Sequence, residues 1–460
     1  MNKEIQVEAT LTAVGEPVAI GMSKAARAGM SDAEWREATR FDSTDWGWII
    51  MSIGMAIGAG IVFLPVQVGI VGVWVYLLAA AVGYPALYLF QRLFVNTLAV
   101  SPECTDYPSV ISHYLGKNWG IFLGAIYFVM IVISIFVYST AITNDSASFL
   151  YSFEVTDTIL SSNPFYGLGV ICLLVAIAAQ GEKILFKVST GLVLTKLLAI
   201  IVLGLIMVSH WNLANVPALP SLSDALYQAF TMLPLTLTSI LFIQTLSPMV
   251  ISYRSHNKSV DVAWHKSLRA MNISFGVLFV TIFFFAISFN LAMSHEQAVM
   301  AASQNISALA IAASEMDGDT VRILSLLLNI FSIMTAFFGV FLAFKESCQG
   351  IAINLLKRVY DEDCINRKAI AWGTLVFGVL VAWGAIILNI PVLRLLTWMG
   401  PIMGIIGCFI PTYLVYKLDF LARFRSPSLM FIIAAGILLS SFAVFLKNSL
   451  RSVKGSLVTI

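Results

Sequence analysis

Charged residues are scarce in this chain. Asp, Glu, Lys and Arg make up 11% of its 460 residues, whereas apolar residues make up 59%. A soluble domain carries about 25% charged and about 45–50% apolar residues, so a soluble fold could not bury this much apolar surface. The net charge of +2 is too small to indicate a nucleic-acid partner. The composition excludes an ordinary soluble protein and predicts that the lipid bilayer surrounds the chain.

Cysteine and histidine are also sparse. The five cysteines are odd in number and lack metal-ligand spacing, and the five histidines are scattered over loops and helix ends. We therefore expect no disulfide framework and no metal site. An intramembrane enzyme needs clustered catalytic residues, which are missing, and no segment resembles the pore loop of a channel. A receptor that shares a transporter fold stays open as an alternative.

Long apolar runs dominate what is present. Runs of about 18 to 25 residues match the length at which a helix crosses the hydrocarbon core. They predict an all-α polytopic membrane protein with about eleven transmembrane helices. The expected segments 1 to 11 lie at about 47–70, 73–96, 119–143, 164–180, 186–208, 229–252, 268–292, 321–344, 369–389, 393–416 and 428–446.

Basic residues fall in alternate loops. The loops at about 144–163, 209–228 and 293–320 contain no Lys or Arg, whereas the other loops contain many. The positive-inside rule then predicts a cytoplasmic N-terminus and a periplasmic C-terminus in a bacterial inner membrane. Residues 1–45 are polar and lack a signal-peptide pattern, so they are expected to be a cytoplasmic tail, with residues 448–460 as a second tail.

Segments 1 and 6 share helix-weakening residues near their middles. Segment 1 holds Gly54, Gly58-Ala59-Gly60 and Pro65, and segment 6 holds Pro234 and Thr245, Ser247 and Pro248. Glycine and proline weaken helices, and a broken helix survives in a membrane only where protein or a polar cavity meets its free backbone groups. Packing of Gly54 and Gly58 against another helix is the alternative interpretation.

Two breaks five helices apart predict an inverted repeat, because a unit of five helices repeated in tandem enters the membrane from opposite sides. We expect one transmembrane domain at 46–447, with repeat 1 at about 46–208, repeat 2 at about 229–416 and an extra peripheral helix at about 428–446. Broken helices at matching places in inverted halves indicate a transporter with its binding site near the midplane.

Several motifs resemble the hydroxy and aromatic amino acid permeases. They are Ala56-Ile57-Gly58-Ala59-Gly60 with Phe63 and Pro65, Tyr138, Ile142-Thr143-Asn144, Ser247-Pro248-Met249-Val250, and Phe337-Phe338-Gly339 before Glu346. The resemblance implies the leucine-transporter-like fold and import of an amino acid with protons. The Ser-Pro pair resembles the serine and threonine branch, although that branch tends to carry a lysine where this chain has Met334 and Thr335.

A zwitterionic amino acid needs compensation for both of its charges in low dielectric. Free N–H groups around Ala56, Gly58, Ala59, Gly60 and Ile61 suit the carboxylate, and free carbonyls near Gln244, Thr245 and Leu246 suit the ammonium. For a substrate hydroxyl the candidates are Ser247, Thr245, Gln244 and Tyr138. Tyr138 is also consistent with a packed aromatic, and Ser247 with a cap for a carbonyl freed by Pro248.

Lys196 lies deep inside segment 5, and an ionisable residue at such depth indicates function. In some relatives with this fold, a segment 5 lysine replaces a sodium ion. That resemblance implies a proton-coupling role in which Lys196 meets carbonyls near Ala56 and the hydroxyl of Ser332 or Thr335. A lysine bonded only for structure, or reaching an interface, is the alternative.

The remaining expectations concern Glu346 and the substrate. Glu346, near the inner end of segment 8, suits a surface ion pair or gate, with proton carriage as the alternative. We expect import of serine or threonine by proton symport without any cofactor. Cysteine, a D-amino acid, an aromatic amino acid or sodium coupling stay open.

Overall fold

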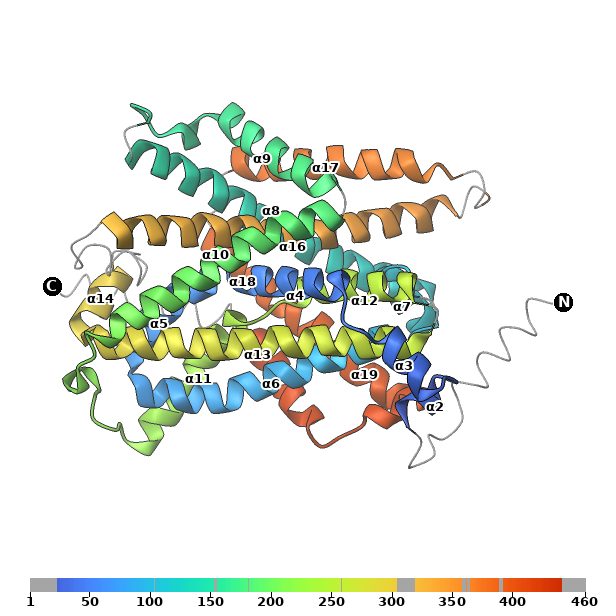
Figure 1. The fold of residues 1–460 in the computed structure, drawn as a ribbon, viewed down its shortest axis with the longest axis horizontal. Coiled ribbons are helices and arrows are strands. Elements are labelled where there is room, and N and C mark those ends of the chain that lie inside the picture. The colour runs from blue at the N-terminus through green and yellow to red at the C-terminus, as the bar shows by residue number, and fades with distance from the viewer. Residues whose placement is uncertain are drawn as a thin grey trace.

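The computed structural model describes residues 23–102, 104–152, 155–180, 182–257, 259–303, 319–357, 361, 365–388 and 392–440. These residues form a bundle of helices without a strand (Figure 1). Seven stretches are long and apolar enough to cross a membrane. They are α6 (Val73–Ala99), α8 (Lys117–Ser152), α10 (Glu182–Val208), α13 (Val260–Ala292), α16 (Asp319–Leu356), α17 (Arg367–Leu388), and Trp398–Lys417, which joins α18 (Val392–Met403) through a π-helical turn (Gly404–Phe409) to α19 (Ile410–Lys417).

Two more crossings are broken helices. The first is α4 (Ser43–Ala56) followed by α5 (Ala59–Val71), and the second is α11 (Leu222–Ser239) followed by α12 (Ile243–His256). Two shorter apolar helices, α9 (Pro164–Ala179) and Leu429–Ser440, complete the set. The chain is therefore an all-α polytopic membrane protein, as its hydropathy predicts.

The two halves of the bundle run in opposite directions. Three helices of the first half contact the helix at the same place in the second half: α6 contacts α13, α8 contacts α16 and α9 contacts α17. The two broken crossings also contact each other, α4 with α12 and α5 with α11. In Figure 1, α4 and α5 run from right to left, whereas α11 and α12 run from left to right. This pairing is the arrangement expected of an inverted repeat, and it places both broken helices in the middle of the bundle.

The two ends of the bundle differ in charge. The helix α7 (Tyr107–Leu115) lies at the end where the Lys- and Arg-containing loops lie, which we call the basic end. The helix α14 (His295–Ser303) lies at the opposite end (Figure 1), which we call the acidic end because its loops contain Asp and Glu but no Lys or Arg. Two short helices, α2 (Lys24–Arg27) and α3 (Asp32–Ala38), stand at the basic end within the predicted tail. A capping box between Ser31 and Glu34 starts α3.

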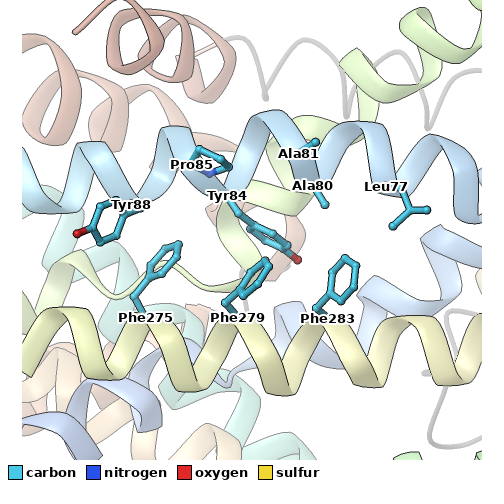
Figure 2. Close-up of a pocket in the computed structure, with 9 residues that line it drawn as sticks. All are labelled: Leu77, Ala80, Ala81, Tyr84, Pro85, Tyr88, Phe275, Phe279 and Phe283. Atoms are coloured by element: carbon cyan, nitrogen blue, oxygen red, sulfur yellow. The ribbon is translucent and has the colours of Figure 1, made fainter. Parts of the chain in front are cut away.

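An apolar groove of about 550 Å³ lies between α6 and α13, where Tyr84 and Phe279 approach each other edge to face (Figure 2). Its lining is aromatic and aliphatic, and none of the residues proposed for the substrate site lies in it. Because a zwitterion needs polar partners, this groove is not a candidate for the substrate site.

Candidate functional site

The first helix breaks at Ile57 and Gly58. The Gly58 amide bonds to the Ala56 carbonyl at 2.8 Å, and Ile57 has φ −76° and ψ 74°, which together form a three-residue inverse γ-turn. In a continuous helix that amide would bond to the carbonyl of Gly54. The turn therefore frees the Gly54 carbonyl for another donor and engages the carbonyl of Ala56.

The start of α5 leaves backbone N–H groups free. Gly58 is the N-cap and no side chain caps the helix, so the first N–H groups, beginning at Ala59, have no partner within it. Such an end carries partial positive charge and suits a carboxylate. The side chains of Ala59, Gly60 and Ile61 lie outside the described part of the structure.

Tyr138 on α8 stands beside this break. A Cβ atom added to Gly58 would lie 3.4 Å from the Tyr138 hydroxyl, so the hydroxyl group is almost in contact with the backbone of the turn. Tyr138 is partly buried. Glycine at position 58 thus leaves room for both the turn and the tyrosine, and the hydroxyl is placed next to the proposed carboxylate site.

The second helix breaks at residues 240–242, between Pro234 and Pro248, and both prolines lie in helices. The Phe242 amide donates to the side-chain oxygen of Gln91 on α6 at 3.2 Å. The sequence analysis does not identify Gln91, although a glutamine inside an apolar segment, here near its end beside Arg92, is the signal that would have found it. Gln91 meets a backbone donor that the break would otherwise leave unpaired.

The carbonyls predicted to bind an ammonium need a correction, because Gln244, Thr245 and Leu246 all lie inside α12. A helical carbonyl bonds to the amide four residues on, so the carbonyls of Thr245 and Leu246 are not set free by the break. Pro248 lacks an N–H and therefore releases only the carbonyl of Gln244. The Gln244 side-chain oxygen is also buried and has no protein partner among the described residues.

Thr245 joins the two broken helices. Its hydroxyl lies 3.2 Å from the hydroxyl of Ser52 on α4 and donates to the Phe242 carbonyl at 2.8 Å. Both residues are fully buried. The Thr245 hydroxyl thus holds the backbone of the break, which leaves it less free to meet a substrate than the sequence suggests.

Lys196 reaches the first break from α10. Its ammonium donates to the Gly54 carbonyl at 2.9 Å, to the Ile57 carbonyl at 3.0 Å and to the Thr335 hydroxyl at 2.6 Å. The side chain is fully buried, and no salt bridge among the described residues includes it. The partners of the Lys196 ammonium among the described residues are therefore all neutral oxygens. Two of them, the Gly54 and Ile57 carbonyls, can accept from it because the helix is broken.

Thr335 and Ser332 lie on α16, one turn apart. The Thr335 hydroxyl accepts from Lys196 and lies 3.0 Å from the Gly54 carbonyl. The Ser332 hydroxyl is buried and has no protein partner in the described structure. Of the two hydroxyls proposed for Lys196, the structure therefore brings that of Thr335 to the ammonium.

Ser247 and Glu346 lie together toward the basic end. The Glu346 carboxylate accepts from the Tyr107 amide at 2.8 Å and from the Ser247 hydroxyl at 3.1 Å. Because Tyr107 begins α7, the carboxylate meets a free amide at a helix N-terminus. Glu346 thus ties α7 and α12 to α16, and the Ser247 hydroxyl is engaged there instead of at the break.

A buried ionic network, which the sequence analysis misses, links the start of α4 to α12 and α13. The Asp45 carboxylate accepts from Arg269 at 2.8 Å and from the Tyr253 hydroxyl at 2.7 Å, and Lys266 lies 3.4 Å away. Lys266 also pairs with Asp42. Partial burial raises the pKa of the Asp42 carboxyl, but hydrogen bonds from Lys266 and nearby backbone amides outweigh it and hold that pKa below its ordinary value.

Similar proteins are known. The chain is 61% identical over 433 residues to the probable serine transporter of Escherichia coli strain K12, covering 93% of this chain and 98% of that protein. It is 25% identical over 427 residues to the serine transporter SdaC of the same strain, with 90% and 96% covered. It is 24% identical over 426 residues to the threonine/serine transporter TdcC of Yersinia enterocolitica, with 87% and 95% covered. No family model matches the chain.

Two broken, mutually inverted helices at the centre of a polytopic bundle define a class of protein, the membrane transporter. Its relatives are named transporters, not enzymes. With these likenesses over nearly the whole length, the chain belongs to the serine and threonine branch of the hydroxy and aromatic amino acid permease family. The chain belongs to this branch although it has Met334 and Thr335 where the branch tends to carry a lysine.

Proposed function

We propose that this protein imports a small neutral hydroxy amino acid, with serine as the first candidate, by proton symport. The relatives named as serine or threonine/serine transporters support the substrate. The observation that carries the proton coupling is the set of three neutral oxygens around the buried ammonium of Lys196. An ammonium in this place fills the oxygen cage that a coupling cation would otherwise need.

The substrate carboxylate binds at the start of α5, where Gly58 and the following residues present free N–H groups at the positive end of the helix. The substrate ammonium meets the carbonyl and the unpartnered side-chain oxygen of Gln244. Tyr138, whose hydroxyl lies beside Gly58, is the nearest candidate for contact with the substrate hydroxyl. Thr245 and Ser247 act through the shape of α12, since their hydroxyls are engaged elsewhere.

Coupling follows from the position of Lys196. The ammonium holds the Gly54 carbonyl, which precedes the turn that presents the carboxylate site, and the carbonyl of Ile57, the central residue of that turn. Loss of its proton weakens both bonds and changes the shape of that turn, so protonation favours substrate binding. One proton moving inward across 100 mV supplies about 2.3 kcal/mol, a concentration ratio of about fifty.

Alternating access requires that the two ends open in turn. We assign the basic end to the cytoplasm of a bacterial inner membrane by the positive-inside rule, with a periplasmic C-terminus. Glu346, which ties α7 to α12 at this end, then acts as a latch on the cytoplasmic side. Glu346→Ala should open this end more often and so increase maleimide labelling of the neighbouring Cys104 relative to Cys172. Unchanged labelling would show that Glu346 does not hold this end closed.

The test of the function is uptake by the purified protein in proteoliposomes. With an acid-outside gradient, the concentration of labelled L-serine inside the vesicles should rise above that outside. The proton gradient should drive this accumulation without a sodium gradient. Accumulation that requires a sodium gradient and does not depend on pH would contradict the coupling role of Lys196. No accumulation under either gradient would contradict active transport of serine. Competition by threonine, cysteine, D-serine and tryptophan then ranks the substrates.

A further inference from the structure

Asp145 is a carboxylate inside a membrane-spanning helix that the proposed function does not use. It lies near the end of the apolar stretch Asn118–Ala147 of α8, just beyond the segment expected from the sequence, and is partly buried. Asp145 follows Tyr138 by seven residues, so it stands on the same face of α8, about 10 Å nearer the acidic end. An ionisable group inside a membrane helix indicates a functional role.

The hydrogen-bond partners described at Asp145 and the adjacent Ser146 are neutral. Asn329 of α16 donates its side-chain amide to the carboxylate at 3.0 Å. The adjacent Ser146 accepts a hydrogen bond from Tyr166 of α9 at 2.8 Å. None of the salt bridges in the described residues includes Asp145. No cation among the described side chains therefore fixes the carboxylate, and none of the described ion pairs breaks when it gains or loses a proton.

Polar residues of α16 lead from Asp145 to Lys196. Asn329, Ser332 and Thr335 follow one another at intervals of three residues, so they are neighbours on the helix surface. At one end Asn329 holds Asp145, and at the other Thr335 holds Lys196 at 2.6 Å. Ser332 in the middle is 1% exposed, and its hydroxyl has no protein partner among the described residues. It is free to join a chain of proton carriers, with water where a gap exceeds hydrogen-bond reach.

We propose that Asp145 is a proton relay between the medium at the acidic end and Lys196, a role that rests on the proton symport proposed above. The Asp145 carboxylate takes a proton from the medium and becomes a carboxylic acid. It passes that proton through the hydroxyls of Ser332 and Thr335 to the neutral amine of Lys196, which becomes an ammonium. The acid returns to a carboxylate, so charge and protons balance.

The experiment compares three variants in proteoliposomes: Asp145→Asn, Asp145→Glu and, as a matched control, Asp157→Asn, which changes an exposed acid at the same end. Two rates are measured for each: serine uptake driven by an acid-outside gradient, and serine exchange at equal pH on both sides. During serine exchange the protein can stay protonated while one serine replaces another, so exchange does not need the proton relay.

Asp145→Asn should lower gradient-driven uptake by about a hundredfold, the smaller end of what a positioned proton carrier contributes, and should leave exchange unchanged. Asp145→Glu and Asp157→Asn should keep both rates. Wild-type uptake in Asp145→Asn would overturn the relay, as would parallel loss of exchange and uptake in both Asp145 variants, because that pattern indicates a structural role. If wild-type protein itself ignores the acid gradient, the proposed symport fails instead.

Discussion

Two buried lysines in this protein have opposite surroundings. Lys266 on α13 is 4% exposed and lies against the carboxylates of Asp42 and Asp45 at the basic end. Lys196 on α10 is fully buried and donates only to two carbonyls and a hydroxyl. The first ammonium is compensated by opposite charge, whereas the second is solvated by neutral oxygens alone.

The difference shows what each lysine is suited to do. Removing one partner of a buried ion pair leaves the other charge uncompensated, which costs more than the pair contributes. A buried charge without a counter-charge already carries that cost, so its neutral form is accessible and its proton can be exchanged. We therefore assign Lys266 to stability and Lys196 to coupling.

The largest expected effect is on stability. Lys266→Met leaves Asp42 without its cation and removes one of the two cations beside Asp45. Because the Asp42 side chain is 48% exposed, we expect a loss of about 2 kcal/mol in the free energy of unfolding, below the value for a fully buried pair. Lys196→Met should cause no such loss, because it removes an uncompensated charge. Thermal unfolding in detergent measures both. Equal destabilisation by Lys266→Met and Lys196→Met would contradict the assignment of Lys266 to stability and of Lys196 to coupling.

A smaller effect is expected when Lys196 keeps its charge and loses one acceptor. Thr335→Val removes the hydroxyl 2.6 Å from the ammonium, and a hydrogen bond to a charged group contributes about 1.5–3 kcal/mol. We expect acid-driven serine uptake to fall by about tenfold or more. Thr335→Ser keeps the hydroxyl and serves as the control. Equal uptake by the valine and serine variants would show that this hydroxyl does not support coupling.

The smallest effect concerns pH at the basic end. Lys266 and nearby backbone amides hold the pKa of Asp42 below its ordinary value of 3.8, against the effect of burial. A lowered folded-state pKa contributes stability that is present above the ordinary value and is lost as pH falls through the folded value. The melting temperature should therefore drop on acidification below about pH 4, and less steeply in Asp42→Asn. If the melting temperatures of wild type and Asp42→Asn fell equally steeply with pH, Asp42 would not contribute to the loss of stability in acid.

Much of the fold could be predicted from the sequence because the bilayer makes apolar length and backbone breaks informative. The break at Gly58 is such a case, since glycine beside a run of apolar residues marks where a membrane helix stops. The break in segment 6 is placed less well. Pro234 and Pro248 suggest its region, but the chain opens at residues 240–242, because Gln91 on another helix meets the Phe242 amide.

The candidate site could be predicted only in part, because side-chain contacts between distant segments leave no local pattern. Lys196 stands out as a lone charge in an apolar run, and Thr335 is indicated for it through the family resemblance. The partners of Ser247 and Asp45 are different. Ser247 meets Glu346, 99 residues away in the chain, and Asp45 meets Arg269 at a separation of 224, so only the fold brings these pairs together.

The most direct test of proton coupling at Lys196 is uptake by Lys196→Met in proteoliposomes. Labelled serine is supplied under an acid-outside gradient, and serine exchange at equal pH is measured in the same vesicles. We expect exchange to persist and gradient-driven accumulation to disappear, because methionine keeps the packing of the lysine stem but carries no proton. Accumulation in Lys196→Met at the wild-type level would contradict the role of Lys196.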